Sequence, residues 1–127
     1  MSNLNIYVDN IVASYPNGTG SSTSPTELTN GTVTYYDSMG TIEVTLGQNM
    51  VIDLVNQNGG VTLNAEQLTW ESGDHLGITE ATTSGSTFTV LPDAVGTEEF
   101  NVIFSFNSGG NTYWCLIDPQ LEVNQGS

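Results

Sequence analysis

The stretch Glu98–Val123, EEFNVIFSFNSGGNTYWCLIDPQLEV, decides the fold class of this chain. Large side chains alternate with mostly polar ones in its first half, and period-two alternation places one set on a single face of a strand. That set is Phe100, Val102, Phe104 and Phe106. Residues 107–111, Asn-Ser-Gly-Gly-Asn, favour a hairpin loop because they accept positive φ. The β-branched and aromatic run over 112–117 then predicts the return strand.

The end of this block predicts one more strand. Asp118-Pro119 stops the return strand, since proline cannot donate to a ladder and extends the residue before it. Residues 120–123 read as a short last strand. We expect the whole block to pack in the core, with Cys115 as a buried small hydrophobe.

The rest of the chain carries the same kind of pattern. It predicts strands over 3–12, 32–36, 41–46, 50–56, 61–70 and 87–91, and a short one from Ile78. Residues 65–68 could instead form one helical turn. The Gly/Ser/Thr/Pro-rich segment 16–31 is expected to be a surface loop with freedom to move. About seven to nine short strands with essentially no helix predict a single all-β domain over 1–127, an antiparallel sandwich or barrel.

The charge balance constrains the partners. The 127 residues include 14 carboxylates, one histidine and no lysine or arginine, for a net charge of −14. Nucleic acid and anionic membrane surfaces would therefore repel the chain. Repulsion between copies should weaken as the carboxylates protonate toward the pI of about 4.1, or when cations screen them. We expect a homo-oligomer or a higher self-assembly under those conditions.

Targeting signals are not apparent. The first residues, Met-Ser-Asn-Leu-Asn, lack a basic region followed by an apolar run, and no window approaches the length of a membrane span. A single cysteine cannot form an internal disulfide. These features favour a cytoplasmic location. Asn17-Gly-Thr and Asn30-Gly-Thr match the glycosylation sequon, and we interpret both as turns.

Catalytic and metal chemistry find little support. A blue-copper site needs two histidines besides Cys115, and the chain has one. Glu71, Asp74 and His75 match a zinc site weakly, and Glu71, Asp74 and Glu80 could hold calcium only outside the EF-hand pattern. No nucleophile elbow or phosphate-binding glycine motif occurs. We therefore expect no catalytic residue, no cofactor and no bound metal.

Sugar binding is the alternative function that the residues allow. Trp70 stands beside Glu71, Asp74 and His75, and an aromatic platform next to hydrogen-bonding groups is typical of carbohydrate-binding sandwiches. These four residues are the candidate ligand-binding set, with a glycan as the ligand.

Asp53 poses a separate question, because it interrupts the otherwise apolar run 50–56 of an expected central strand. A buried carboxylate needs hydrogen-bond donors. With no lysine or arginine in the chain, those donors should be backbone amides, hydroxyls, side-chain amides or water.

Two motifs resemble one known family. The run from Gly96 to Phe106, its turn, and the run from Tyr113 through Asp118-Pro119 to Val123 resemble the C-terminal signature of the AidA/PixA family of bacterial inclusion-body proteins. The segment 6–17, which ends in Tyr-Pro-Asn, resembles that family's opening strand. Together the motifs cover about a third of the chain. The resemblance implies an immunoglobulin-like β-sandwich in the cytoplasm of a bacterium, without known catalytic residues. Together with the one-signed charge, the two motifs lead us to expect a non-enzymatic, self-associating protein.

Overall fold

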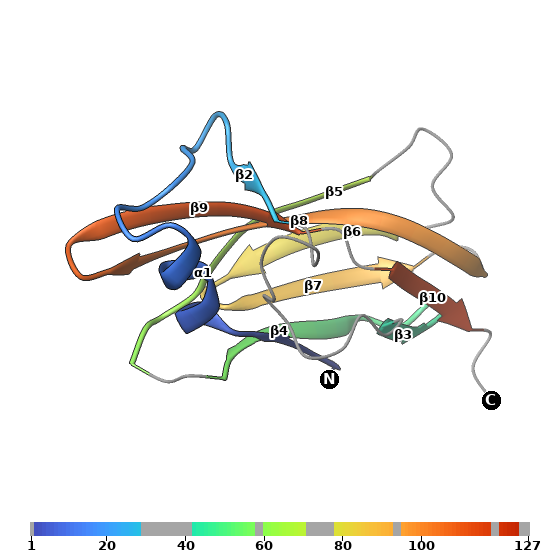
Figure 1. Cartoon of the computed structure of the whole chain (residues 1–127). Helices are drawn as coiled ribbons and strands as arrows, with labels where there is room; N and C mark the ends of the chain where they lie inside the picture. Colours follow the sequence, from blue (N-terminus) through green and yellow to red (C-terminus); the bar gives the residue numbers. More distant parts are fainter. Residues whose placement is uncertain are drawn as a thin grey trace.

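The computed structural model of the chain describes residues 2–28, 42–57, 60–70, 78–92, 95–117 and 120–124 (Figure 1). One short helix and ten strands occur in these ranges. In chain order they are β1 (Ser2–Ile6), α1 (Val8–Ser14), β2 (Thr26–Glu27), β3 (Ile42–Thr45), β4 (Met50–Asn56), β5 (Asn64–Trp70), β6 (Ile78–Ser84), β7 (Thr87–Pro92), β8 (Gly96–Ser108), β9 (Asn111–Ile117) and β10 (Gln120–Asn124).

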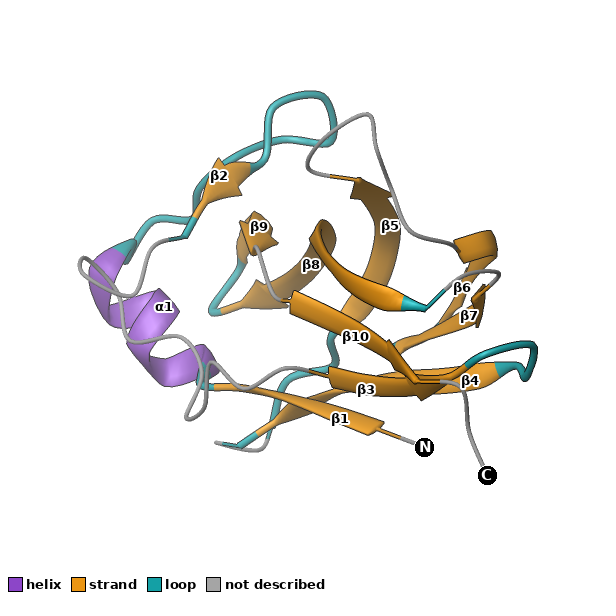
Figure 2. Ribbon diagram, turned by 90° about the vertical axis from the view of Figure 1, so that its right-hand side faces the viewer, coloured by secondary structure: helices purple, strands orange, loops and turns teal. Residues whose placement is uncertain are grey.

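The strands form two sheets. One has four strands in the order β1-β4-β7-β6, and the other has six, in the order β2-β9-β8-β10-β3 with β5 also paired to β8. Figure 2 shows β1 and β4 on one side of the molecule, β8 and β9 on the opposite side, and α1 between β1 and β2 at one end. The β-rich, two-sheet architecture expected from the sequence is therefore present.

Both sheets are mixed. Among the described strands, β1 pairs in parallel with β4, β2 with β9, and β10 with β3, whereas the remaining pairings are antiparallel. A parallel pair needs a long connection, and α1 together with the segments after it separates β1 from β4. The expectation of purely antiparallel pairing thus holds for only part of the fold.

The decisive stretch forms one long hairpin. Ser108 lies opposite Asn111, Val102 opposite Ile117, and Val123 opposite Gly96, so β9 and β10 follow β8 in a single unbroken register. β9 ends at Ile117 and β10 begins at Gln120. The predicted strand end at Asp118-Pro119 itself lies outside the described residues, and the strands on either side of it share one register.

The hairpin turns on two glycines. Gly109 and Gly110 have φ angles of 58° and 82°. Positive φ at both central residues is the mark of a type I′ turn, whose twist matches that of the flanking strands. The observed turn is thus shorter than the loop predicted over 107–111, because Ser108 and Asn111 already pair with each other.

The core lies between the layers and follows the predicted alternation. Phe100, Val102, Phe104 and Phe106 of β8 are all 1% exposed or less. Buried side chains from the other sheet, from α1 and from β9 complete it, including Leu4, Ile6, Val8, Ile11, Ile52, Leu54, Phe88, Val90, Tyr113, Cys115 and Ile117. The expected central strand over 50–56 is β4, which lies between β1 and β7.

The N-terminal segment corrects one prediction. The expected strand over 3–12 ends at Ile6, and α1 follows from Val8. Val8 and Ile11 are buried and Val12 packs against the core. Their spacing of three and four residues is that of one helical face. The apolar pattern over 8–12 therefore fits a helix, although the alternation over 4–8 predicted a strand.

Other predictions have clear outcomes. Residues 65–68 belong to β5, so the alternative of a helical turn there is wrong. β2 adds a short strand within the segment 16–31 that was expected to be a loop. The strand expected over 32–36 lies outside the described residues. Across the described ranges, no helix is long and apolar enough to cross a membrane.

Candidate functional site

The four residues of the predicted sugar site cannot be placed. Trp70 ends β5 and its backbone pairs with Phe100, but its side chain lies outside the described part of the structure. Glu71, Asp74 and His75 also lie outside the described residues, as does the side chain of Glu80 in β6. The glycan and calcium hypotheses built on these side chains remain predictions.

The described residues contain no cluster of metal ligands, and the one cysteine is not placed to react. Within these ranges, no three His, Cys, Asp or Glu side chains come together as a metal site. Cys115 is fully buried between the layers, and burial raises the pKa of its thiol to about 12. Because the thiolate is the nucleophilic form, this position supports the prediction that Cys115 is a packing residue.

The end of the N-terminal motif, together with Thr19 two residues after it, docks on the hairpin motif. Thr19 forms a parallel bridge with Tyr113, and its amide donates to the carbonyl of Thr112 while the amide of Trp114 donates to the carbonyl of Thr19. The Asn111 side-chain amide donates to the Pro16 carbonyl over 3.2 Å. The two sequence motifs that resembled one family are therefore parts of one contact in the tertiary structure.

Asp53 has the kind of donor that the sequence required. The Ser86 hydroxyl donates to Asp53 Oδ1 over 2.7 Å. Asp53 is half-buried rather than fully buried, because it points away from the core between Ile52 and Leu54. The prediction of a hydroxyl, amide or water partner is confirmed.

The outer face of the larger sheet carries a cluster that the sequence did not single out. Ile103 lies directly opposite Leu116, and Trp114 lies opposite Ser105. Their neighbours Phe104 and Cys115 point into the core, so these side chains face outward. We name Ile103, Trp114 and Leu116 the outer patch; all three are half-buried.

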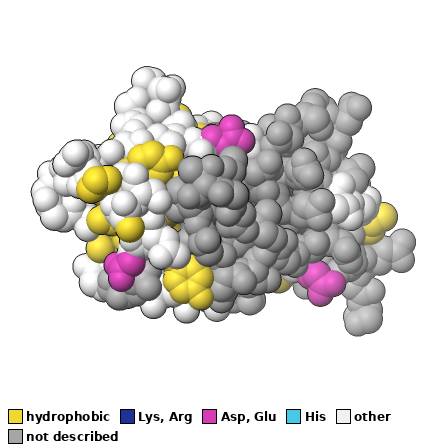
Figure 3. Space-filling model, in the orientation of Figure 1, with side chains coloured by type: hydrophobic (Ala, Val, Ile, Leu, Met, Phe, Trp, Pro, Cys, Tyr) yellow, Lys and Arg dark blue, Asp and Glu magenta, His cyan; other side chains and the backbone are white. Residues whose placement is uncertain are grey.

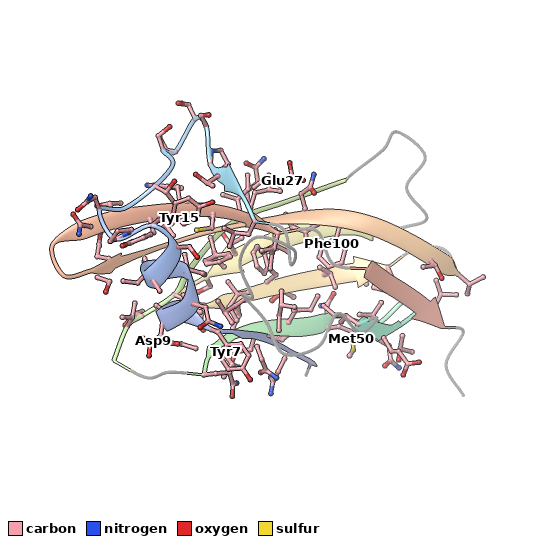
Figure 4. The ribbon with its side chains drawn as sticks, viewed as in Figure 1. Tyr7, Asp9, Tyr15, Glu27, Met50 and Phe100 are labelled. Atoms are coloured by element: carbon pink, nitrogen blue, oxygen red, sulfur yellow. The ribbon has the colours of Figure 1, made fainter. Side chains whose placement is uncertain are left out.

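Two carboxylates frame the outer patch. Glu27 of β2 is paired with Leu116 and is exposed. In Figure 4, Glu27 and the core residue Phe100 lie on opposite sides of the larger sheet. On the other side, β5 has a register shift between Ala65 and Gln67, which leaves Glu66 as an extra residue. Such bulges redirect side chains.

Glu66 is held over the sheet by a buried hydroxyl. Ser105 is 7% exposed, and its hydroxyl donates to Glu66 Oε1 over 2.7 Å. A hydrogen bond to a charged acceptor is stronger than one between neutral groups. Ser105 therefore orients one carboxylate at the edge of the outer patch.

The sequence divides the residues of the return strand into two faces but does not show which face is the outer one. Alternation over 112–117 separates Tyr113 and Cys115 from Trp114 and Leu116, but apolar residues occupy both sets. Choosing the core set requires the pairing with Phe104 and Phe106. Glu66 could not be assigned to this face because its position depends on the bulge in β5.

The acidic side chains on the described surface have no lysine or arginine among them. Figure 3 shows carboxylates at a few separate places on one face, among them side chains near α1 and near β2, and no basic side chain on its described part. Apolar side chains also reach this face around α1. Any partner of the described surface therefore meets charge of one sign.

Comparison with known proteins identifies a structural relative. No family model matches the sequence, and no curated protein matches it. The structure is similar to the crystal structure of an inclusion body protein, PixA, from Burkholderia cenocepacia J2315, with a TM-score of 0.68. The match covers 97% of this chain and 96% of that chain at 13% sequence identity. The resemblance to the PixA family is confirmed at the level of the fold.

Proposed function

We propose that this protein is a non-enzymatic, self-associating member of the AidA/PixA inclusion-body family. The observation that carries the proposal is the similarity in fold to PixA over nearly the whole of both chains. The two sequence motifs add support from the sequence, and they meet in the structure where Tyr15 and Pro16 contact Tyr113 and Asn111.

The non-enzymatic part of the proposal rests on the similarity in fold to an inclusion body protein. The one cysteine is buried, and burial holds the pKa of its thiol near 12. Within the described ranges the acidic side chains do not gather into a metal-binding group. The sugar-binding alternative has no described side chain in its favour.

Charge supports a conditional form of self-association. A copy with a net charge of −14 repels another copy at pH 7. Protonation of carboxylates toward the pI of about 4.1 removes this repulsion. Divalent cations screen the charge or bridge carboxylates of two copies. We therefore propose dispersed protein at neutral pH and low salt, and assembly when charge is neutralised.

Light scattering across pH 7 to 4, with and without millimolar calcium or magnesium, tests the assembly proposal. We expect particle mass to rise as the pH falls, and at pH 7 on addition of divalent cation. Sodium chloride at matched ionic strength is the control for screening alone. Return to pH 7 should restore the small particle, which separates assembly from irreversible precipitation. A monomer under all these conditions would contradict the proposal.

We further propose that the two layers are a variant of the immunoglobulin-like sandwich implied by the resemblance, and that the protein acts in the bacterial cytoplasm. The two sheets with a shared core support the first point. An experimental structure whose strand order cannot be superposed on an immunoglobulin domain would contradict it. Cell fractionation with a cytoplasmic marker tests the second, and recovery outside the cytoplasmic fraction would overturn it.

A further inference from the structure

We propose that the outer patch is a docking surface for a basic polypeptide segment, with arginine or lysine side chains paired to Glu27 and Glu66. The inference is independent of the self-association proposed above. It rests on the apolar centre formed by Ile103, Trp114 and Leu116, on the two framing carboxylates, and on the composition of the chain.

The centre of the surface can contact both parts of an arginine or lysine side chain: the indole ring of Trp114 attracts the charge, and the apolar side chains cover the stem. Trp114 is half-buried and lies diagonally across the ladder from Ile103. A cation over an indole ring is attracted by the negative face of the ring. The stems of arginine and lysine also cover apolar surface while their charged ends reach outward.

The rim supplies acceptors of the opposite charge. Glu27 and Glu66 are exposed and stand on strands at opposite edges of the β2-β9-β8-β5 region. Ser105 donates to Glu66 Oε1, and among the described residues no partner is recorded for Oε2. One carboxylate is thus oriented in advance, which lowers the entropy cost of pairing.

Charge also decides between occupants. A second copy of this chain has no lysine or arginine to offer, so it would bring further carboxylates toward Glu27 and Glu66 at pH 7. Like charges placed together oppose association. At pH 7, charge complementarity therefore favours a different, basic molecule over a second copy.

The register gives the expected spacing. Glu27 and Glu66 are separated by three strand-to-strand steps across β2, β9, β8 and β5, or roughly 14 Å at about 4.8 Å a step. An extended segment rises about 3.4 Å per residue, so two basic side chains about four residues apart span the same distance. The residue midway between them lies over the outer patch.

Peptide binding at pH 7 and low salt tests the proposal. The probe is a labelled synthetic peptide with two arginines separated by three residues, the middle one leucine, followed by fluorescence anisotropy. A second peptide has the same composition with adjacent arginines. We expect the spaced peptide to bind about threefold or more tightly, which is the scale of one weak ion pair. Equal affinity for the two peptides would overturn the geometry.

Variants locate the contact. Glu27→Gln and Glu66→Gln should each weaken the spaced peptide by about two- to fivefold, and Trp114→Leu by about fivefold. Ser105→Ala should weaken binding less than Glu66→Gln does, because the carboxylate remains but is no longer oriented. Thermal unfolding of each variant shows whether the fold is retained; the exposed Glu→Gln changes decide the matter if Trp114→Leu does not fold.

Glu43→Gln is the matched control. Glu43 is exposed on β3, which pairs with β10 and not with the region of the outer patch, and its substitution changes the net charge equally. If all three glutamate variants weaken binding to the same extent, only the general field of the protein attracts the peptide and the proposal is wrong. It is also wrong if Glu27→Gln and Glu66→Gln change acid-induced self-association and leave peptide affinity unchanged, since a second copy would then occupy this face.

Discussion

The hydroxyl of Tyr113 donates a 2.6 Å hydrogen bond to the backbone carbonyl of Tyr15, 98 residues earlier in the chain. Tyr113 is fully buried, and its ring stacks on Phe106 with centroids 4.6 Å apart and planes 5° from parallel. Its apolar body is therefore part of the core, while its polar end joins the segment after α1 to the hairpin. A buried tyrosine hydroxyl needs such a partner.

Tyr113→Phe should lower the free energy of unfolding by about 1–3 kcal/mol. The substitution keeps the stacked ring but removes the donor to the Tyr15 carbonyl, and a buried acceptor without a partner is costly. Urea unfolding followed by tryptophan fluorescence measures the change. Tyr7→Phe is the matched control, because the half-buried Tyr7 has no recorded hydroxyl hydrogen bond among the described residues. Equal stabilities of the two variants would show that the bond contributes nothing.

Gly20→Ala should destabilise the fold more than Gly47→Ala. The two glycines have φ of 73° and 76°, so both substitutions cost about 1–2 kcal/mol of backbone strain. At Gly20 a Cβ would also press against the Trp114 carbonyl and lie 2.9 Å from the Thr26 nitrogen, whereas at Gly47 nothing lies within 4 Å. The clash should add about 1–3 kcal/mol. Thermal unfolding of both variants provides the comparison, and the idea fails if their losses match.

Cys115 should resist thiol reagents in the native protein. It is fully buried, and burial raises the pKa of its thiol to about 12, so both access and the reactive thiolate are lacking. Ellman's reagent at pH 8 should react slowly with native protein and at once with protein unfolded in urea. Rapid stoichiometric reaction without denaturant would contradict the burial of this side chain.

The same thiol should make stability fall at alkaline pH. Between the ordinary pKa of 9.0 and about 12, the unfolded thiol is ionised and the native thiol is not. The unfolded state then binds fewer protons, so this contribution is complete below pH 9 and is lost as pH rises toward 12. At pH 11 the loss should be roughly 2–3 kcal/mol. Cys115→Ala should lack this component when urea unfolding is compared at pH 8 and pH 11; an identical pH dependence in both proteins would refute it.

Ser86→Ala should cost about 1 kcal/mol of unfolding free energy. Ser86 donates to Asp53 Oδ1 over 2.7 Å in a half-buried setting, and charge-assisted hydrogen bonds exceed neutral ones. Ser84→Ala is the control, since Ser84 is exposed and has no recorded side-chain hydrogen bond within the described residues. Both can be measured by urea unfolding. A Ser86→Ala loss no greater than that of Ser84→Ala would mean that water replaces the hydroxyl without cost.

Local patterns in the sequence determined most of the strands and, in β8, the inward face. Alternation from Phe100 to Phe106 predicted which side chains enter the core, and paired glycines at 109 and 110 predicted the turn. These features depend only on neighbours along the chain, because side chains alternate across a strand and glycine alone adopts positive φ readily. The absence of lysine and arginine likewise determined the sign of the surface.

Only the tertiary structure decided how those strands associate. The parallel pairing of β1 with β4, the place of α1 between the layers, and the bond from Tyr113 to Tyr15 all join residues far apart in the chain. Trp114 faces outward because β8 and β9 share one register, and Glu66 reaches the same face because β5 is bulged. Pairing register and bulges depend on the partner strand as well as on the strand itself. The sequence thus determined most of the strands and the sign of the charge, and the packing between distant segments decided which side chains form a surface.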